Sequence, residues 1–326
     1  MRDGVAWGHE MGTDSSRIGP QQFDRRSFLA GMGALAGASI LASWVPLSSA
    51  RAGETSRLAV AKGEAASATR LALEALGGID SFVKSGDSVV LKPNASFPNP
   101  PSWGCNTSPE VVATVARLCL EAGARRVVVV DNTLGNPQLC FSRSGLRDAL
   151  SSIPQVRLVA PKQEGMYREV QVPRGRALRS TKVFGEVMES ERLINLPTAK
   201  SHSATGVSLG LKGLMGLVWD RNTFHRDMDL DQAIADLATV LRPTLTILDG
   251  TRGLLTAGPG GPGKVEQWNT VVAGTDPVAV DAYGVTLGQW YGQRVRPDQV
   301  KHLLAARAHG LGTLELGRVE ILERGA

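Results

Sequence analysis

Residues 108–131 read Ser-Pro-Glu-Val-Val-Ala-Thr-Val-Ala-Arg-Leu-Cys-Leu-Glu-Ala-Gly-Ala-Arg-Arg-Val-Val-Val-Val-Asp. The triplet Ser108-Pro109-Glu110 is typical of a helix start, because serine can cap a helix and proline fits its first position. Gly123 is a typical helix stop, so we expect a helix over 109–123. The valines at 127–130 form a continuous apolar run, which is typical of a strand in a parallel sheet covered on both faces.

The same alternation continues on both sides of this stretch. Before it, apolar runs at 58–61 and 88–92 predict strands, and the spacing over 64–76 predicts a helix. After it, we expect strands at 192–196, 245–248, 271–273 and 314–322, and helices at 230–241, 277–290 and 298–309, with Asp276 as a cap before Pro277. This order predicts an α/β fold: a mostly parallel sheet with helices on both faces.

One segment is less regular. Residues 142–189 contain scattered proline and arginine, with candidate strands at 157–159 and 169–172. Two interpretations remain open: an insertion into the α/β domain, or the start of a second lobe.

The first 52 residues resemble an export signal. Arg25-Arg26 precede Ser27-Phe28-Leu29, residues 27–50 carry no charge, and small residues end the segment at Ala52. This pattern predicts a twin-arginine signal peptide at 1–52, recognised by the twin-arginine translocase, and a domain at 53–326 that is periplasmic or extracellular. The alternative is an uncleaved signal that anchors the chain in the membrane.

The composition is that of an ordinary globular protein, with 326 residues, 42% hydrophobic and 21% charged. Fibrous and disordered classes are therefore excluded. The net charge of +5 is spread along the chain, without a basic run interleaved with aromatic residues, so we expect no nucleic-acid partner.

Two cofactor classes are not expected. The three cysteines include no Cys-x-x-Cys pair, which argues against a ferredoxin-type iron–sulfur cluster. Cys119 is expected in the core, whereas Cys105 and Cys140 are either bridged or free. No Gly-x-Gly-x-x-Gly follows the first strand, and the glycine–proline run 258–264 lacks phosphate-loop spacing, so we expect no nucleotide motif. The run 258–264 instead predicts a mobile loop over the site.

Polar segments follow several of the expected strands. Because ligands of α/β folds bind beyond the carboxyl ends of the strands, segments 92–94, 131–133, 197–202 and 249–252 are the candidate rim of a site. Lys92, Asn94 and Lys200 are expected to bind a small anionic ligand there, together with Lys212, a charge within an apolar run.

Two histidines and an aspartate form a candidate metal site. His202, His225 and Asp249 are a ligand set that suits a divalent transition metal with open coordination positions. His202, Lys212 and His225 are the candidate catalytic residues, since imidazole suits proton transfer near neutral pH. Acid–base chemistry without a metal, and histidines that only hold loops in place, remain open.

Several short motifs, taken in order, resemble a family described as domain of unknown function 362. They are Val89-Val90-Leu91-Lys92-Pro93-Asn94, Thr107-Ser108-Pro109-Glu110 with Glu121-Ala122-Gly123-Ala124, Lys200-Ser201-His202, Leu211-Lys212-Gly213, His225, Asp249-Gly250, Gly258-Pro259 and Thr275-Asp276-Pro277-Val278-Ala279-Val280-Asp281. The resemblance covers most of residues 58–290 and implies roles for the matching lysines, histidines and aspartates, including Asp276 and Asp281. Gly213 stands where the family usually has asparagine, and the ferredoxin-type segment of many members is missing from these 326 residues. The layout is also similar to nickel-dependent racemases of hydroxy acids, at the level of the fold alone.

The sequence thus predicts an exported α/β protein whose pocket of His, Asp and Lys residues binds a divalent metal or an anionic small molecule and acts on it as an enzyme. The alternative is a non-catalytic periplasmic protein that binds an anion or an assembly partner.

Overall fold

The computed structural model describes residues 56–325, so the expected signal at 1–52 lies outside the described residues. Helix α3 spans Pro109–Glu121 and strand β3 spans Arg126–Val130, as expected. Gly123 has a φ of +86°, and a Cβ at this position would lie 2.9 Å from the hydroxyl of Ser85. Ser108 occupies the cap position, but its hydroxyl donates to Glu110 and accepts no helix N–H. The expected helix is confirmed, and capping by the Ser108 side chain is wrong.

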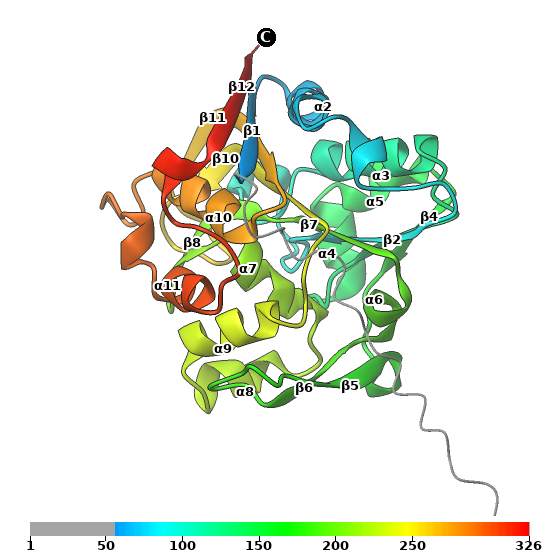
Figure 1. Cartoon of the computed structure of the whole chain (residues 1–326). Coiled ribbons are helices and arrows are strands. Elements are labelled where there is room, and N and C mark those ends of the chain that lie inside the picture. Colours follow the sequence, from blue (N-terminus) through cyan, green and yellow to red (C-terminus); the bar gives the residue numbers. More distant parts are fainter. Residues whose placement is uncertain (1–55, 326) are drawn as a thin grey trace, which may run out of the picture. The chain divides into compact units, whose positions relative to one another are not determined.

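A sheet of ten strands forms the centre of the fold. Besides β3, its strands are β1 (Arg57–Lys62), β2 (Ser88–Pro93), β4 (Val156–Val159), β7 (Arg192–Leu196), β8 (Thr198–His202), β9 (Gly206–Ser208), β10 (Leu245–Leu254), β11 (Val265–Gly274) and β12 (Glu320–Gly325). The order is β12-β1-β11-β10-β7-β2-β3-β4, with β8 paired to β10 and β9 to β8 (Figure 1). Pairings of β11 with β1 and β10, and of β8 with β9, are antiparallel, and the others are parallel. The sheet is mixed but mostly parallel, as predicted.

Helices cover both faces of the sheet. Alternate residues of a strand face opposite sides, so on β1 Leu58 and Val60 belong to one core and Ala59 and Ala61 to the other. The first core includes α9 (Leu230–Ala238), α10 (Pro277–Thr286) and α11 (Lys301–Ala308), and the second includes α2 (Ala65–Ala75), α3, α4 (Pro137–Arg143) and α5 (Leu146–Ser151). Figure 1 shows these two groups on opposite sides of the sheet. Helices on both faces are thus confirmed.

The irregular segment is shorter than expected. Its first part forms α5 and β4, and β4 pairs with β3 at the edge of the main sheet. Strands β5 (Tyr167–Gln171) and β6 (Ser180–Phe184) then form a separate antiparallel pair, followed by α6 (Gly185–Glu189). Tyr167 and Phe184 pack into the same core as α9, and the described residues all fall in one compact unit. The segment is therefore packed on the common core.

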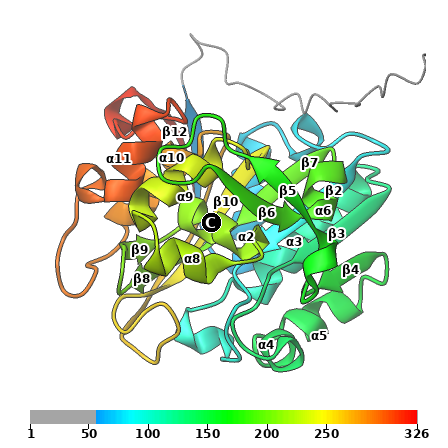
Figure 2. The same cartoon turned by 90° about the horizontal axis from the view of Figure 1, so that it is seen from below.

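Three short elements cover the carboxyl ends of the central strands. Helix α7 (Gly210–Gly213), a 3-10 turn at Leu214–Leu217 and helix α8 (Arg221–Arg226) follow β9. Figure 2 shows α8 and α9 on this side of the molecule, beside the β5–β6 pair. The sequence patterns indicated none of these three elements. The same patterns predicted a loop at 197–202, where the structure has strand β8. Within residues 56–325 no helix is long and apolar enough to cross a membrane.

Candidate functional site

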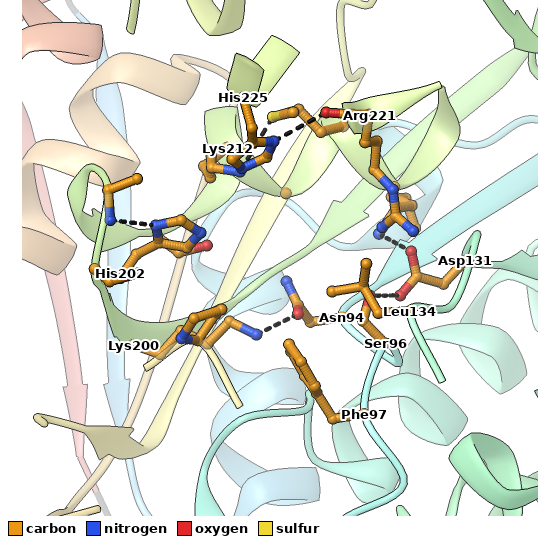
Figure 3. Close-up of a pocket in the computed structure, with 18 of the residues that line it drawn as sticks. Asn94, Ser96, Phe97, Asp131, Leu134, Lys200, His202, Lys212, Arg221 and His225 are labelled. Carbon is orange, nitrogen blue, oxygen red and sulfur yellow. Dashed lines mark hydrogen bonds and ion pairs between the residues drawn. The ribbon is translucent and has the colours of Figure 1, made fainter. Parts of the chain in front are cut away.

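A pocket of about 340 Å³ opens at the carboxyl ends of β2, β3 and β8 (Figure 3). Strand β2 and the turn after it contribute Lys92 and Asn94, and β8 contributes Lys200 and His202. The remaining polar lining includes Asp131, Lys212, Arg221 and His225. The pocket therefore gathers every lysine and histidine that the sequence placed at the rim.

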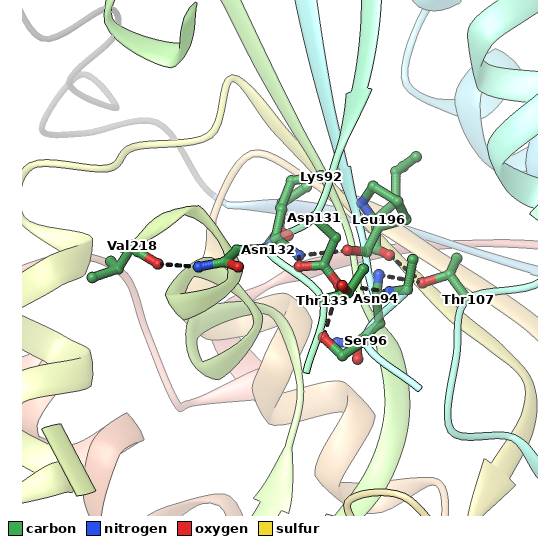
Figure 4. A network of polar contacts seen from close by, with 12 residues as sticks. Lys92, Asn94, Ser96, Thr107, Asp131, Asn132, Thr133, Leu196 and Val218 are labelled. Carbon is green, nitrogen blue, oxygen red and sulfur yellow. Dashed lines mark hydrogen bonds and ion pairs between the residues drawn. The ribbon is translucent and has the colours of Figure 1, made fainter. Parts of the chain in front are cut away.

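Lys92 and Asp131 form a buried ion pair in the floor of the pocket (Figure 4). Their Nζ and Oδ1 atoms are 3.0 Å apart, and both side chains are 1% exposed. The other carboxylate oxygen of Asp131 accepts from the N–H of Ala95 and the hydroxyl of Ser96, both at 2.8 Å. Burial alone would raise the pKa of Asp131, but Lys92, Arg221 and the Ala95 N–H outweigh it and lower that pKa. Burial lowers the pKa of Lys92 despite the attraction of Asp131.

The ends of neighbouring strands are tied together around this pair. The N–H of Asn94 donates to the hydroxyl of Thr107 at 2.8 Å, and that hydroxyl donates to the carbonyl of Leu196 at 2.7 Å. Asn132, next to Asp131, donates its amide to the carbonyl of Val218 at 2.9 Å (Figure 4). The first two bonds join the end of β2 to β7, and the third joins the turn after β3 to the segment between the helices of Lys212 and Arg221.

Lys200 is held as an ammonium by two oxygen atoms. Its Nζ donates to Oδ1 of Asn94 and to the carbonyl of Cys105, each at 2.6 Å, and lies 4.9 Å from the centre of the Phe97 ring. Burial nevertheless lowers the pKa of Lys200 to about 8. The cation is thus oriented toward the pocket without an acidic partner.

Lys212 has a different environment. Its Nζ contacts the sulfur of Met215 at 3.1 Å and Nε2 of His225 at 3.4 Å. Burial, with repulsion from Arg221 and Lys200, lowers the pKa of Lys212 to about 7. A substantial fraction of this amine is therefore neutral at neutral pH.

Hydrogen bonds assign opposite tautomers to the two histidines. The carbonyl of Arg221 can only accept, so Nδ1 of His225 carries the hydrogen that bonds it at 2.9 Å, and Nε2 is left as an acceptor facing Lys212. The N–H of Ala204 donates to Nδ1 of His202 at 3.1 Å, so the hydrogen of neutral His202 lies on Nε2. Burial and nearby cations lower the pKa of His202 to about 3. The rings are 6.1 Å apart, one a donor and the other an acceptor.

Arg221 is a pocket residue that sequence reasoning missed. Asp220 caps α8 by accepting from the N–H groups of Asn222 and Thr223, which places Arg221 at the first position of the helix. Its partly buried guanidinium lines the pocket and lowers the pKa of both Asp131 and Lys212. The Asp220 cap was a sequence signal that could have identified this helix start.

The pocket is strongly cationic. Lys92, Lys200, Lys212 and Arg221 line it, and Asp131 is the one carboxylate among its lining residues. The rim adds apolar side chains, of which Leu134 is 60% exposed. A ligand with negative charge fits this lining, because isolated buried cations are unfavourable.

Asp249 does not belong to the site, which corrects the expected metal set. Its buried carboxylate accepts from the N–H of Ser108 at 2.7 Å and from the N–H and hydroxyl of Thr251 at 2.9 and 2.6 Å. It ties β10 to the start of α3 and is absent from the lining of the pocket. Within residues 56–325 no group of three His, Cys, Asp or Glu side chains is placed to hold a metal. The cationic lining and the hydrogen on Nε2 of His202 also do not fit a divalent cation at this point.

The two further aspartates of the family resemblance hold the scaffold. Asp281, on α10, accepts from the N–H groups of Gly210 and Leu211 at 2.7 and 2.8 Å, and so anchors the helix that carries Lys212. Burial raises the pKa of Asp281 to about 7. Asp276 caps α10 by accepting from the N–H of Ala279 at 2.8 Å, as expected.

The remaining candidates surround the pocket. Pro259, from the run 258–264, lines it, and this run is held by a bond from Asn99 to the carbonyl of Gly260 and by one from the Gly258 N–H to Ser201. The three cysteines carry free, buried thiols, so Cys105 and Cys140 are not bridged.

Comparison with known proteins gives a family match and distant relatives. A family model described as domain of unknown function (DUF362) matches residues 89–286. A thylakoid-associated protein of Synechocystis sp. is 32% identical over 223 residues, which cover 65% of this chain and 66% of that protein, just under two thirds of its length.

Two solved structures are similar at lower levels. The lactate racemase apoprotein of Thermoanaerobacterium thermosaccharolyticum has 11% identity and a TM-score of 0.42, over 59% of this chain and 50% of that one. A protein of Thermotoga maritima has 11% identity and a TM-score of 0.37, over 81% of this chain and 52% of that one.

Proposed function

This chain belongs to the DUF362 family, and from the chemistry of its pocket we propose that it binds a small anion there and transfers a proton to or from it. The observation that carries the proposal is the charge of the lining: three buried lysines and the partly buried Arg221 surround one carboxylate. Buried charge without a partner is costly, so a lining of this kind is stabilised by an anionic ligand.

The proton transfer belongs to Lys212 and the two histidines. The Nζ of Lys212 lies 3.4 Å from Nε2 of His225, which is the acceptor nitrogen. A small movement of the two side chains toward each other brings them within the distance at which a proton is transferred. His202 offers an Nε2–H donor from the same pocket. Lys92, Lys200 and Arg221 then bind and orient the anion.

The test is calorimetric titration of the chain with inorganic phosphate. Lys200→Met removes one charge-assisted donor, which is worth about 1.5–3 kcal/mol, so the affinity should fall about tenfold or more. Lys301→Met, an exposed residue of α11, is the matched control and should bind phosphate as the unaltered chain does. Equal affinity in all three proteins, or no anion binding at all, would refute the anion pocket.

A non-catalytic anion-binding role is the second candidate. The observation that favours this role is the ammonium of Lys200, which donates to two oxygen acceptors. An amine held in the charged form binds an anion but does not transfer a proton to it. Under this alternative, Lys212→Met would change the affinity for phosphate, and solvent deuterium would not exchange into the C–H bonds of a bound 2-oxo acid such as pyruvate. Exchange that depends on Lys212 would support the enzyme.

We also propose that residues 1–52 direct export by the twin-arginine route to the periplasm or beyond. The support is Arg25-Arg26 before an uncharged segment of 24 residues, and the Synechocystis relative is itself named as thylakoid-associated. In a fusion of residues 1–52 to a reporter, Arg25→Lys with Arg26→Lys should retain the reporter in the cytoplasm, whereas the control Arg17→Lys should not. Export that survives the double substitution would contradict this route.

A further inference from the structure

We propose that Lys212 is a nucleophile that forms an imine with the carbonyl carbon of an anionic aldehyde or ketone. This inference rests on the proposed anion pocket, and it adds the chemical class of the substrate and a covalent step. It follows from the contacts that distinguish Lys212 from Lys200 (Figure 3) and from Lys92 (Figure 4).

Lys92 and Lys200 are both held in the charged form. Lys92 pairs with the carboxylate of Asp131 and also donates to the carbonyl of Pro93. Lys200 donates to two oxygens, which are acceptors only. Oxygen atoms that only accept favour an ammonium, so neither amine offers a free lone pair.

Lys212 has no such oxygen partner. Among the described residues its Nζ contacts the thioether of Met215 and the ring of His225, and its side chain is 8% exposed. A thioether is a weak acceptor, and burial disfavours the charged amine. A lysine desolvated among other cations is the arrangement that activates an amine as a nucleophile.

His225 is oriented as the base for this amine. Its Nδ1–H is committed to the carbonyl of Arg221, so the lone pair of Nε2 faces Lys212. The base and the nucleophile lie on α8 and α7, which are both anchored: α8 by the Asp220 cap and α7 by Asp281. The pair is therefore positioned before any ligand binds.

The step balances without an oxidant or a reductant. His225 takes a proton from the Lys212 ammonium, and the amine lone pair forms the C–N bond as the carbonyl π bond breaks onto oxygen. A proton passes from nitrogen to that oxygen to give a carbinolamine. Protonated His225 returns its proton to the carbinolamine hydroxyl, which leaves as water while the nitrogen lone pair forms the C=N bond. The sum is ammonium plus carbonyl giving protonated imine plus water.

The rest of the pocket suits such a substrate. Lys200 and Arg221 line the same cavity and are available to its anionic group, and Phe97 and Leu134 offer apolar surface to its carbon skeleton. A cavity of about 340 Å³ is in the range that holds a small organic molecule.

The experiment uses pyridoxal 5′-phosphate, an aldehyde with a phosphate group, at less than one equivalent per chain. Borohydride reduction converts an imine to a stable amine, and peptide mapping by mass spectrometry locates it. We expect the unaltered chain to carry the label on Lys212, and the Lys212→Met variant to carry none at this position. The matched variant Lys200→Met should still be labelled on Lys212, but should need a higher probe concentration. In His225→Ala the rate of imine formation should fall about 100-fold, while phosphate affinity stays within about twofold.

The outcomes separate this inference from the proposed function. Phosphate binding with the label on Lys200 or spread over exposed lysines would overturn the imine step and leave the anion pocket standing. If pyridoxal, which lacks the phosphate group, labelled Lys212 as fast as pyridoxal 5′-phosphate does, the claim that the pocket binds the anionic group would be refuted. Thermal unfolding of each variant shows that a lost label is not a lost fold.

Discussion

Replacing Gly216 by alanine is expected to separate the buried Lys92–Asp131 ion pair. A Cβ at this position would lie 2.1 Å from Oδ1 of Asp131, 2.4 Å from Cε of Lys92 and 2.7 Å from its Nζ. The backbone cannot recede freely, because the carbonyl of Gly216 accepts from the N–H of Asn132 at 2.9 Å. The methyl group must therefore displace the charged side chains.

The magnitude follows from burial of the pair. Both side chains are 1% exposed, so a displaced charge does not reach water easily. Overpacking a core costs about 1–3 kcal/mol, and leaving a buried charge without its partner costs about 3–5 kcal/mol. We expect a loss of about 3 kcal/mol in the free energy of unfolding, which is about a hundredfold in the unfolding constant.

The assay is reversible unfolding in urea, followed by circular dichroism. Gly213→Ala, one turn earlier, is the matched control: a Cβ there meets nothing closer than 3.9 Å, and φ and ψ are helical at −60° and −30°. Alanine is the better helix former by about 1 kcal/mol, so the control should be unchanged or more stable. Equal stability of the two variants would refute the described packing of Gly216 on the ion pair.

Three further outcomes follow from the site. Lys212 and Lys200 have pKa values of about 7 and about 8 when the pocket is empty, and a bound anion favours their ammonium forms. The affinity for sulfate, measured by calorimetry, should therefore be full below about pH 7 and fall as the pH rises. An affinity independent of pH would contradict this. Asp249→Asn should lower the free energy of unfolding in urea by about 1–3 kcal/mol, because this carboxylate accepts from the N–H of Ser108. The affinity for sulfate should stay within about twofold, because Asp249 does not line the pocket. Weaker sulfate binding without lost stability would show that Asp249 belongs to the site. Asp281→Asn should cost about 1–3 kcal/mol and also weaken sulfate binding, since it loosens the helix of Lys212; unchanged sulfate affinity would contradict the anchoring role.

Much of the fold was predictable because its signals are local. The proline at the first position of α3, the glycine after it and the valine run of β3 act within a few residues. Strand β8 was predicted as a loop because its residues, Thr198–His202, are mostly polar, and its strand conformation comes from pairing with β10 and β9. The expected closing strand at 314–322 begins only at Glu320, because a 3-10 turn occupies Leu316–Arg318.

The site was predictable in part. Lysines and histidines that follow strands are brought together because strand ends of a parallel sheet meet at one edge. Asp249 obeys the same rule in sequence, but β10 extends to Leu254 and directs this carboxylate to the start of α3. Arg221 follows no strand and reaches the pocket only because α8 folds across the sheet edge.

The sequence by itself determined the element order, the α/β class and which residues supply positive charge, because these depend on local spacing and residue type. Only the tertiary structure decided that Asp131 neutralises Lys92, that Asp249 is occupied elsewhere, and that Lys212 faces a histidine nitrogen and no carboxylate. These assignments depend on distances between segments far apart in the chain, and packing, not sequence spacing, sets those distances.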